Sequence, residues 1–211
     1  MEKELDKDII RELGSILSNN TANAFSKIIK ENINISTDVG LICLENFKLE
    51  FILTQEFSEA LRDIKKECVS GYFLQTKSGI EGISVLLFKD EHTKRLVSSV
   101  AKNMGGEPGY IEESEEILKE FSSIAMNAHL TALSDLIGMK LQAETPIPAK
   151  DILGAMYDFK EHLKEGNEAE ALMIKTDMVA KETGVEGKLT VLLEPSSYKK
   201  IMEILHKKLN N

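Results

Sequence analysis

The sequence of 211 residues contains no tryptophan, only two cysteines and only four prolines. Long apolar runs are missing too: the run from Val85 to Phe88 has four residues, whereas a helix that crosses a bilayer needs about 20. Residues 1–8 contain no apolar core of a signal peptide. Cys43 and Cys68 stand singly among apolar residues, as buried free thiols do in a reducing compartment. We therefore expect a cytoplasmic protein without a membrane segment.

A surplus of positive charge is also missing. Thirty-five acidic residues exceed 26 basic ones, and the formal net charge is −9. Such a charge repels nucleic acid phosphates, and the lysines are spread over helical segments as on a solvated face. Apolar residues make up 42% of the chain and charged residues 29%, which is ordinary for a soluble globular protein. The composition predicts neither nucleic acid nor membrane as a partner.

Two segments of the sequence recur in the same order. Residues 12–29 resemble residues 120–137, and residues 79–88 resemble residues 184–193. Repeats of this length indicate two copies of one structural unit. Between them lies a breaker cluster, Gly105-Gly-Glu-Pro-Gly109, which predicts a turn. We divide the chain into a first half (1–104), a linker (105–109) and a second half (110–211), which together form one compact domain.

Each half is expected to begin with a helix, continue with a strand hairpin and end with an amphipathic helix. Helical periodicity runs from Ile9 to Ile29 and from Ile117 to Ile137, and the second stripe includes Phe121 and Ile124. The predicted strands are 68–76, 82–88, 169–179 and 187–193, and the predicted closing helices are Asp90–Asn103 and Ser196–Leu209, with Asp90 and Ser196 as caps. A short amphipathic helix is expected over 152–162, without a counterpart in the first half.

The predicted fold class is α/β, of the α+β kind. One copy of about 100 residues would leave the edges of its short sheet open, and an open edge invites aggregation. Pairing the two copies into one sheet removes that liability and merges their cores. We expect an internally duplicated, pseudo-two-fold sandwich with a shared, antiparallel-rich sheet flanked by long helices.

The two opening helices carry the same polar pattern, an acid followed by Glu four residues later and Ser three residues after that. Spacings of four and three place such side chains on one helical face, away from the apolar stripe. An ordinary solvated helix face, with acids that suit the helix dipole, is the alternative explanation. The two triplets are Asp8, Glu12 and Ser15, and Glu116, Glu120 and Ser123.

With this pattern the chain resembles the CheC-like chemotaxis phosphatases of the CheC/CheX/FliY superfamily. Their signature is Asp or Ser, then Glu after four residues, Asn after three more, and Pro 23 residues further on, often in two copies. Glu12 and Glu120 match the signature, and Pro146 stands where the second proline is expected. The Gly-Ile-Glu-Gly segment that ends at Gly82 also resembles the hairpin of the family. The resemblance covers nearly the whole chain, and the length favours CheC over the shorter CheX.

The resemblance implies that the chain acts on a phosphorylated response regulator of the CheY type. Members of the family remove the phosphoryl group from an aspartyl phosphate; the Glu pairs with a lysine of the regulator, and the Asn orients the attacking water. Positioning and electrostatics supply such catalysis. The expected Mg²⁺ belongs to the response regulator, so no cofactor is expected in this chain. The deamidase CheD is a further candidate partner.

The chain departs from the signature in both halves. Ser15 and Ser123 stand in place of the asparagines, Glu116 in place of Asp or Ser, and Asp38 in place of the first proline. A serine hydroxyl is shorter than an amide and offers one donor. The resemblance therefore implies a phosphatase that is weak or inactive. A non-catalytic adaptor for CheY-like or CheD-like partners, as monomer or homodimer, is the alternative, and a scaffold like the FliM middle domain is a third.

Two asparagines follow the altered serines. Asn19 and Asn127 each lie four residues further on, nearly on the same helical face and about 5 Å along the axis. A shifted docking pose would let these amides position the water; ordinary polar helix residues are the alternative. His129, late in the second opening helix, is interpreted as a satisfied core histidine.

Overall fold

The structure is a computed structural model, and it describes residues 2–43, 69–77, 79–103, 111–143, 146–148 and 170–210. Its helices are α1 (Glu2–Ile29), α4 (Asp90–Asn103), α5 (Ile111–Ile137) and α7 (Pro195–Leu209). Its strands are β1 (Ile33–Cys43), β2 (Val69–Lys77), β3 (Gly82–Lys89), β4 (Gln142–Ala143), β5 (Ile147–Pro148), β6 (Glu170–Ala180) and β7 (Glu186–Leu193). None of the described helices combines the length and the apolar character that crossing a membrane would require.

The strands form one sheet in the order β1-β6-β7-β3-β2-β4, and β5 pairs with β2 beside β4. All of these pairs are antiparallel. The central pair joins the two halves of the chain, because β3 comes from the first half and β7 from the second, with Leu86 opposite Leu189. Each half also gives its first strand to the other half, since β1 pairs with β6 and β4 pairs with β2. The predicted shared antiparallel sheet is therefore confirmed, whereas the duplication itself stays a prediction.

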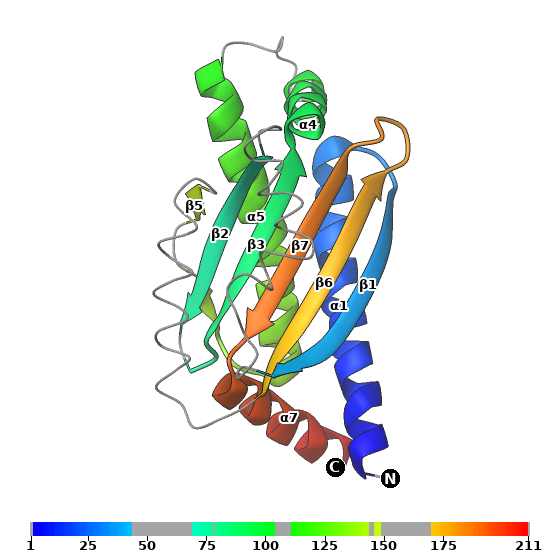
Figure 1. The fold of residues 1–211 in the computed structure, drawn as a ribbon, viewed down its shortest axis with the longest axis vertical. Coiled ribbons are helices and arrows are strands. Elements are labelled where there is room, and N and C mark those ends of the chain that lie inside the picture. Colours follow the sequence, from blue (N-terminus) through cyan, green and yellow to red (C-terminus); the bar gives the residue numbers. More distant parts are fainter. Residues whose placement is uncertain are drawn as a thin grey trace.

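The helices α1 and α5 lie against one face of the sheet and run in opposite directions (Figure 1). An aromatic cluster links both helices to the central sheet. The ring of Phe25 in α1 lies 4.7 Å from that of Phe121 in α5, and Phe121 lies 5.8 Å from Phe88 in β3. All three side chains are buried. Burial of each such side chain stabilises the fold by about 1.5–3 kcal/mol, so this cluster holds the layers together.

The predicted elements agree with the structure to within two residues at the hairpin strands, and α4 has the expected bounds. Gly79 and Gly184 have φ angles of 80° and 65°, the left-handed region that glycine adopts without strain. The predicted tight hairpins are thus confirmed at the positions where a side chain would be costly.

Three strands are missing from the sequence-based assignment: the two-residue strands β4 and β5, and the long strand β1. β1 alternates between half-buried residues, such as Ile35 and Val39, and exposed residues, such as Asn34 and Asp38. This alternation is the pattern of a strand with one covered face, although polar residues dilute its apolar signal. Gly14 of α1 lets the strand lie close to the helix, because a Cβ atom at that position would clash with Val39.

The prediction that Ser196 caps the last helix is wrong. The helix begins one residue earlier, at Pro195, its N-cap is Glu194, and no side chain makes a capping hydrogen bond. Proline suits the first helical position because its fixed φ fits a helix and its missing N–H has no partner there. Asp90 is the first residue of α4, but its side chain lies outside the described residues. The described residues also leave out Cys68, the linker 105–109 and the helix predicted over 152–162.

Glu31 connects the two halves at one end of the sheet. Its side chain is nearly buried, at 8% exposure. Its Oε2 accepts hydrogen bonds from the backbone N–H groups of Glu182 and Thr183, both at 3.0 Å, and from the Thr183 hydroxyl at 3.2 Å. These donors lie in the turn between β6 and β7, so a carboxylate of the first half holds a turn of the second.

His129 is fully buried beneath β3. Its Nε2 lies 2.8 Å from the Ser84 hydroxyl, and its Nδ1 has no partner among the described residues. Burial without a compensating charge lowers the pKa of His129 from 6.5 to about 4, because the charged ring loses its hydration. The interpretation of His129 as a core histidine is confirmed, although only one ring nitrogen is satisfied.

This burial predicts a loss of stability in acid. In the unfolded chain His129 takes up a proton near pH 6.5, but in the folded chain it does so only near pH 4. The stabilisation is therefore complete above pH 6.5 and falls as the pH drops toward 4, by about 3 kcal/mol in total. Urea unfolding of the wild type and of His129→Gln at pH 7, 5.5 and 4 measures it. The wild type should lose about 3 kcal/mol more than the variant; a constant difference between the two would contradict the prediction.

Candidate functional site

The first polar triplet lies on the solvent side of α1. Asp8, Glu12 and Ser15 are all exposed, because the opposite side of the helix buries residues such as Leu13 and Leu17. Asp8 lies 3.5 Å from Arg11 in an ion pair whose side chains are both largely exposed. Pairs of this kind contribute little, about 0–1 kcal/mol. The face is accessible to a partner.

The second triplet has the same placement on α5. Glu116 and Glu120 are exposed, and Ser123 is half-buried. Because α1 and α5 are antiparallel and each triplet lies toward the N-terminal part of its helix, the two faces lie toward opposite ends of the molecule (Figure 1). The structure does not bring the two triplets together, so they form two separate candidate sites.

The asparagines that follow the serines are turned back onto their own helices. The Nδ2 of Asn19 donates to the Ser15 carbonyl at 2.8 Å and lies 3.3 Å from the Ser15 hydroxyl. The Nδ2 of Asn127 makes the same two contacts with Ser123 at the same distances. Each amide must break these bonds before it could donate to a water on a partner. Breaking these bonds therefore costs free energy in the shifted docking pose. The role of the two asparagines in catalysis stays a prediction.

An apolar groove of about 520 Å³ lies beside the second triplet. We call it the α5 groove, and it lies between the C-terminal ends of α1 and α4 and the first half of α5. Glu116 and Glu120 stand among its lining residues. Its other lining residues are Ile28, Lys30, Val100, Asn103, Ile117, Phe121 and Ile124. A groove with two carboxylates on it can bind an apolar side chain and a cation of one partner together.

Ile124 differs from its expected place in the apolar stripe. It is 42% exposed, whereas Phe121, one helical turn earlier, is 2% exposed. The 3.6-residue period places both near the buried side, but Ile124 lines the open α5 groove. Sequence reasoning missed the groove for this reason. The signal available in the sequence was the spacing of seven residues between Ile117 and Ile124. One glutamate of the triplet lies between them and the other directly precedes Ile117.

The remaining predicted site residue is Pro146. It is buried and directly precedes β5, which pairs with β2, and its part in a site stays a prediction. The interpretation of the scattered lysines as a solvated face is also incomplete. The structure gathers Lys30, Lys94, Arg95 and Lys102 around one hollow at the end of the molecule that carries the α5 groove. Within the described part of the chain, no cluster of His, Cys, Asp and Glu side chains has the arrangement of a metal site.

Comparison with known proteins confirms the fold. No family model matches the sequence. FliY of Thermotoga maritima is similar in structure, with a TM-score of 0.64, 18% identity and 96% of each chain covered. CheX of Desulfovibrio desulfuricans gives a TM-score of 0.55 at 11% identity, covering 87% of this chain and 99% of that one. The middle domain of FliM from H. pylori gives 0.54 at 12% identity, covering 95% and 98%. The chain has the CheC-like fold that its sequence predicted.

The exposure difference in the α5 groove predicts unequal costs for two truncations. Ile124→Ala should lower the free energy of unfolding by less than about 1 kcal/mol, because the side chain already contacts water. Phe121→Ala should cost about 3–5 kcal/mol, because it opens a cavity in the aromatic cluster. Urea denaturation of both variants at pH 7 measures the difference. Equal losses would show that Ile124 is covered and that the groove is closed.

Proposed function

We propose that the chain is a chemotaxis signalling protein that binds a phosphorylated CheY-type response regulator at the α5 groove and hydrolyses its aspartyl phosphate slowly or not at all. The observation that carries the proposal is the pair Glu116 and Glu120, exposed on α5 beside an open apolar groove. The CheC-like fold supports it, since structural neighbours include a protein named as the chemotaxis protein CheX.

The α5 groove has the parts that a docking site needs. Ile124 offers exposed apolar area, and apolar anchors in the centre of an interface supply most of the binding energy. Glu120 supplies a carboxylate for a lysine of the regulator, in the manner that the resemblance implies. A charge at the rim of an apolar patch contributes to orientation and to the association rate. The Mg²⁺ of the reaction would be bound by the regulator.

Hydrolysis is expected to be weak for a geometric reason. The family asparagine is replaced by Ser123, which is half-buried and already contacted by Asn127. The Asn127 amide, in turn, donates to the Ser123 carbonyl. Neither group projects a free amide toward a partner. A site of this kind can hold the regulator without positioning the attacking water.

The α1 face is a poorer candidate for the same partner. Ile9, at the position that matches Ile117, is buried at 8% exposure. His206 of α7 contacts Asp6 at 2.7 Å, so α7 covers this end of α1. Asp8 and Glu12 remain exposed, as does Leu5 at 46% exposure, but neither acid lines the α5 groove, whereas Glu116 and Glu120 do. We assign primary binding to α5, and we leave CheD as a further proposed partner.

A second candidate is a non-catalytic scaffold of the flagellar switch. It is favoured by the replacement of both asparagines and by the similarity to FliM middle domains. A chain of the FliG–FliM complex from H. pylori also has this fold, with a TM-score of 0.59 at 11% identity. Binding of a FliG-type protein by this chain, with no affinity for the regulator, would favour this candidate.

Binding to a CheY-type regulator of the same genome tests the proposal. The regulator is activated with beryllofluoride and Mg²⁺, which mimic a stable phosphoryl group, and affinity is measured by calorimetry. We expect Glu116→Ala/Glu120→Ala and Ile124→Asp each to weaken binding by about tenfold or more. The matched variant Asp8→Ala/Glu12→Ala on α1 should bind as the wild type does. Equal affinity for the active and inactive regulator would contradict the proposal.

Moving the amide by one turn tests the explanation for weak hydrolysis. Ser123→Asn/Asn127→Gly removes the helix-bound amide and places an asparagine at the position that the signature assigns to it on α5. It should accelerate decay of the phosphorylated regulator by at least about tenfold over the wild type, because one well-placed group contributes about that much or more. The matched variant Ser15→Asn/Asn19→Gly on α1 should have a smaller effect. No acceleration in either variant would show that the amide position is not what limits hydrolysis.

A further inference from the structure

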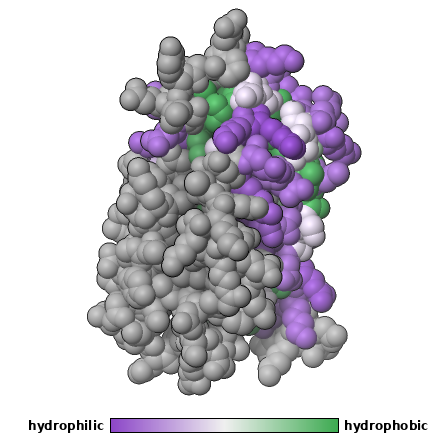
Figure 2. All heavy atoms as spheres, turned by 45° about the horizontal axis from the view of Figure 1, so that its top comes forward, coloured by the Kyte–Doolittle hydropathy of each residue, from purple (hydrophilic) through white to green (hydrophobic). Residues whose placement is uncertain are grey.

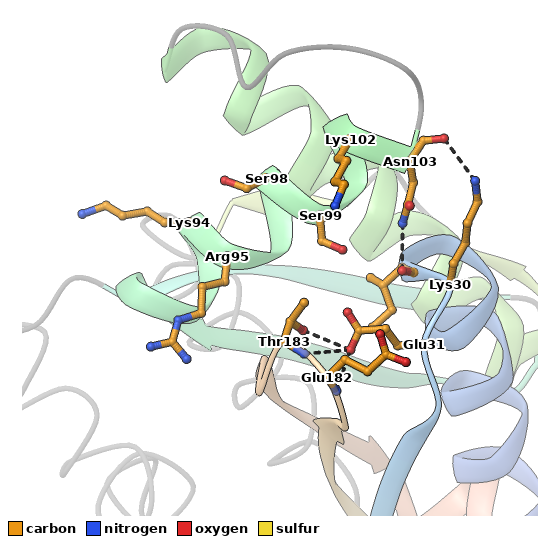
Figure 3. Close-up of a pocket in the computed structure, with 11 residues that line it drawn as sticks. Lys30, Glu31, Lys94, Arg95, Ser98, Ser99, Lys102, Asn103, Glu182 and Thr183 are labelled. Carbon is orange, nitrogen blue, oxygen red and sulfur yellow. Dashed lines mark hydrogen bonds between the residues drawn. The ribbon is translucent and has the colours of Figure 1, made fainter.

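A second hollow, of about 610 Å³, lies at the same end of the molecule as the α5 groove. We call it the polar trough. It is bounded by α4, by the turn between α1 and β1 and by the turn between β6 and β7 (Figure 3). The cations that line it are Lys30, Lys94, Arg95 and Lys102. Hydrophilic side chains cover much of the described surface in the view onto this end (Figure 2).

The polar trough has a surplus of positive charge, because four of the described residues that line it are cations and two are acids. Arg95 and Lys102 have no ion pair among the described residues. Lys30 donates to the backbone carbonyl of Asn103 at 3.2 Å, which does not neutralise its charge. Two acids also line the trough: Glu31, whose carboxylate accepts bonds from the β6–β7 turn, and the exposed Glu182. In a chain with a net charge of −9, a local surplus of cations is unusual.

The cations are spread along a line and do not converge on one point. Arg95 and Lys102 are seven residues apart on α4, which places them about 10 Å apart along the helix axis. The hydroxyl groups of Ser98 and Ser99 lie between them on the same helix and also line the trough. An extended ligand with several carboxylates would reach both cations and would accept hydrogen bonds from the serines.

The polar trough and the α5 groove adjoin each other. Lys30 and Asn103 line both hollows. Asn103 also fastens α4 to the end of α1, because its Nδ2 donates to the Ile29 carbonyl at 2.8 Å. A protein that docks in the groove therefore lies next to the trough and can extend into it without any rearrangement of α4.

We propose that the polar trough receives an acidic polypeptide segment of the same protein that docks in the α5 groove. The inference rests on the proposed function, and it adds the chemistry of a second contact on the partner. Charge complementarity favours an acidic segment. Nucleic acid fits less well, because none of the described residues that line the trough is aromatic and could stack on a base, and the net charge of the chain repels a phosphate backbone.

The trough can be tested without the partner. Deca-glutamate is titrated into the ¹⁵N-labelled full chain at low salt, and the amide shifts of Ser98, Ser99 and Lys102 are followed. We expect saturable shifts that vanish in Arg95→Glu/Lys102→Glu. They should persist in Lys200→Glu/Lys207→Glu, a matched charge reversal on exposed positions of α7 with the same spacing. Absence of shifts in the wild type, equal loss in both variants, or tighter binding of a ten-residue oligothymidine would overturn the proposal.

The response regulator then separates this inference from the proposed function. With the beryllofluoride-activated regulator, Arg95→Glu/Lys102→Glu should slow association by about tenfold at low salt and flatten its salt dependence, with little change in dissociation. The α7 variant should behave as the wild type does. If the regulator binds and the trough variant binds it equally fast, the trough inference fails and the proposed function stands. If the trough binds deca-glutamate but the regulator does not bind at all, the proposed function fails. The trough then remains an acidic-segment site, with its link to that partner refuted.

Discussion

The pairing of β3 with β7 is the constraint on which the rest of the structure depends. It joins one strand of each half at the centre of the sheet, so neither half completes its sheet alone. The antiparallel helices α1 and α5 then lie over one continuous face, with Phe25, Phe88 and Phe121 packed between the layers. Because the helices run in opposite directions, the two acid faces point toward opposite ends. A chain with two similar motifs therefore has two separate sites.

The ends of the molecule differ although the motifs are alike. At the α5 end, an apolar groove and a trough rich in cations share Lys30 and Asn103. At the α1 end, Ile9 is buried and His206 contacts Asp6. Apolar area and complementary charge are the quantities that distinguish a binding surface from a solvated helix face. Divergence of the surroundings, more than of the motifs, gives the two sites different expected roles.

Much of the fold was predictable because local patterns were strong. The helical stripe of α5, the amphipathic α4 and the glycines at Gly79 and Gly184 each carry a signal within a few residues. β1 was missed because polar residues alternate with its apolar ones. Which face of the strand is covered becomes clear only once α1 packs against it. The cap at Ser196 was wrong because the proline before it begins the helix. Ile124 fits the stripe by period, but its exposure depends on how the other helices pack against α5.

Residue types and their spacing predicted the class of fold, the exposure of Glu12 and Glu120, and the serines Ser15 and Ser123 at the positions where the signature has asparagine. These features depend on residue type and on spacing within one helix, which local periodicity reports. Only the tertiary structure decided that Asn19 and Asn127 bind their own helices, that a groove adjoins one site, and that scattered lysines meet in one trough. Each of these depends on side chains from elements far apart in the chain or on a rotamer choice. No pattern along a single segment contains that information.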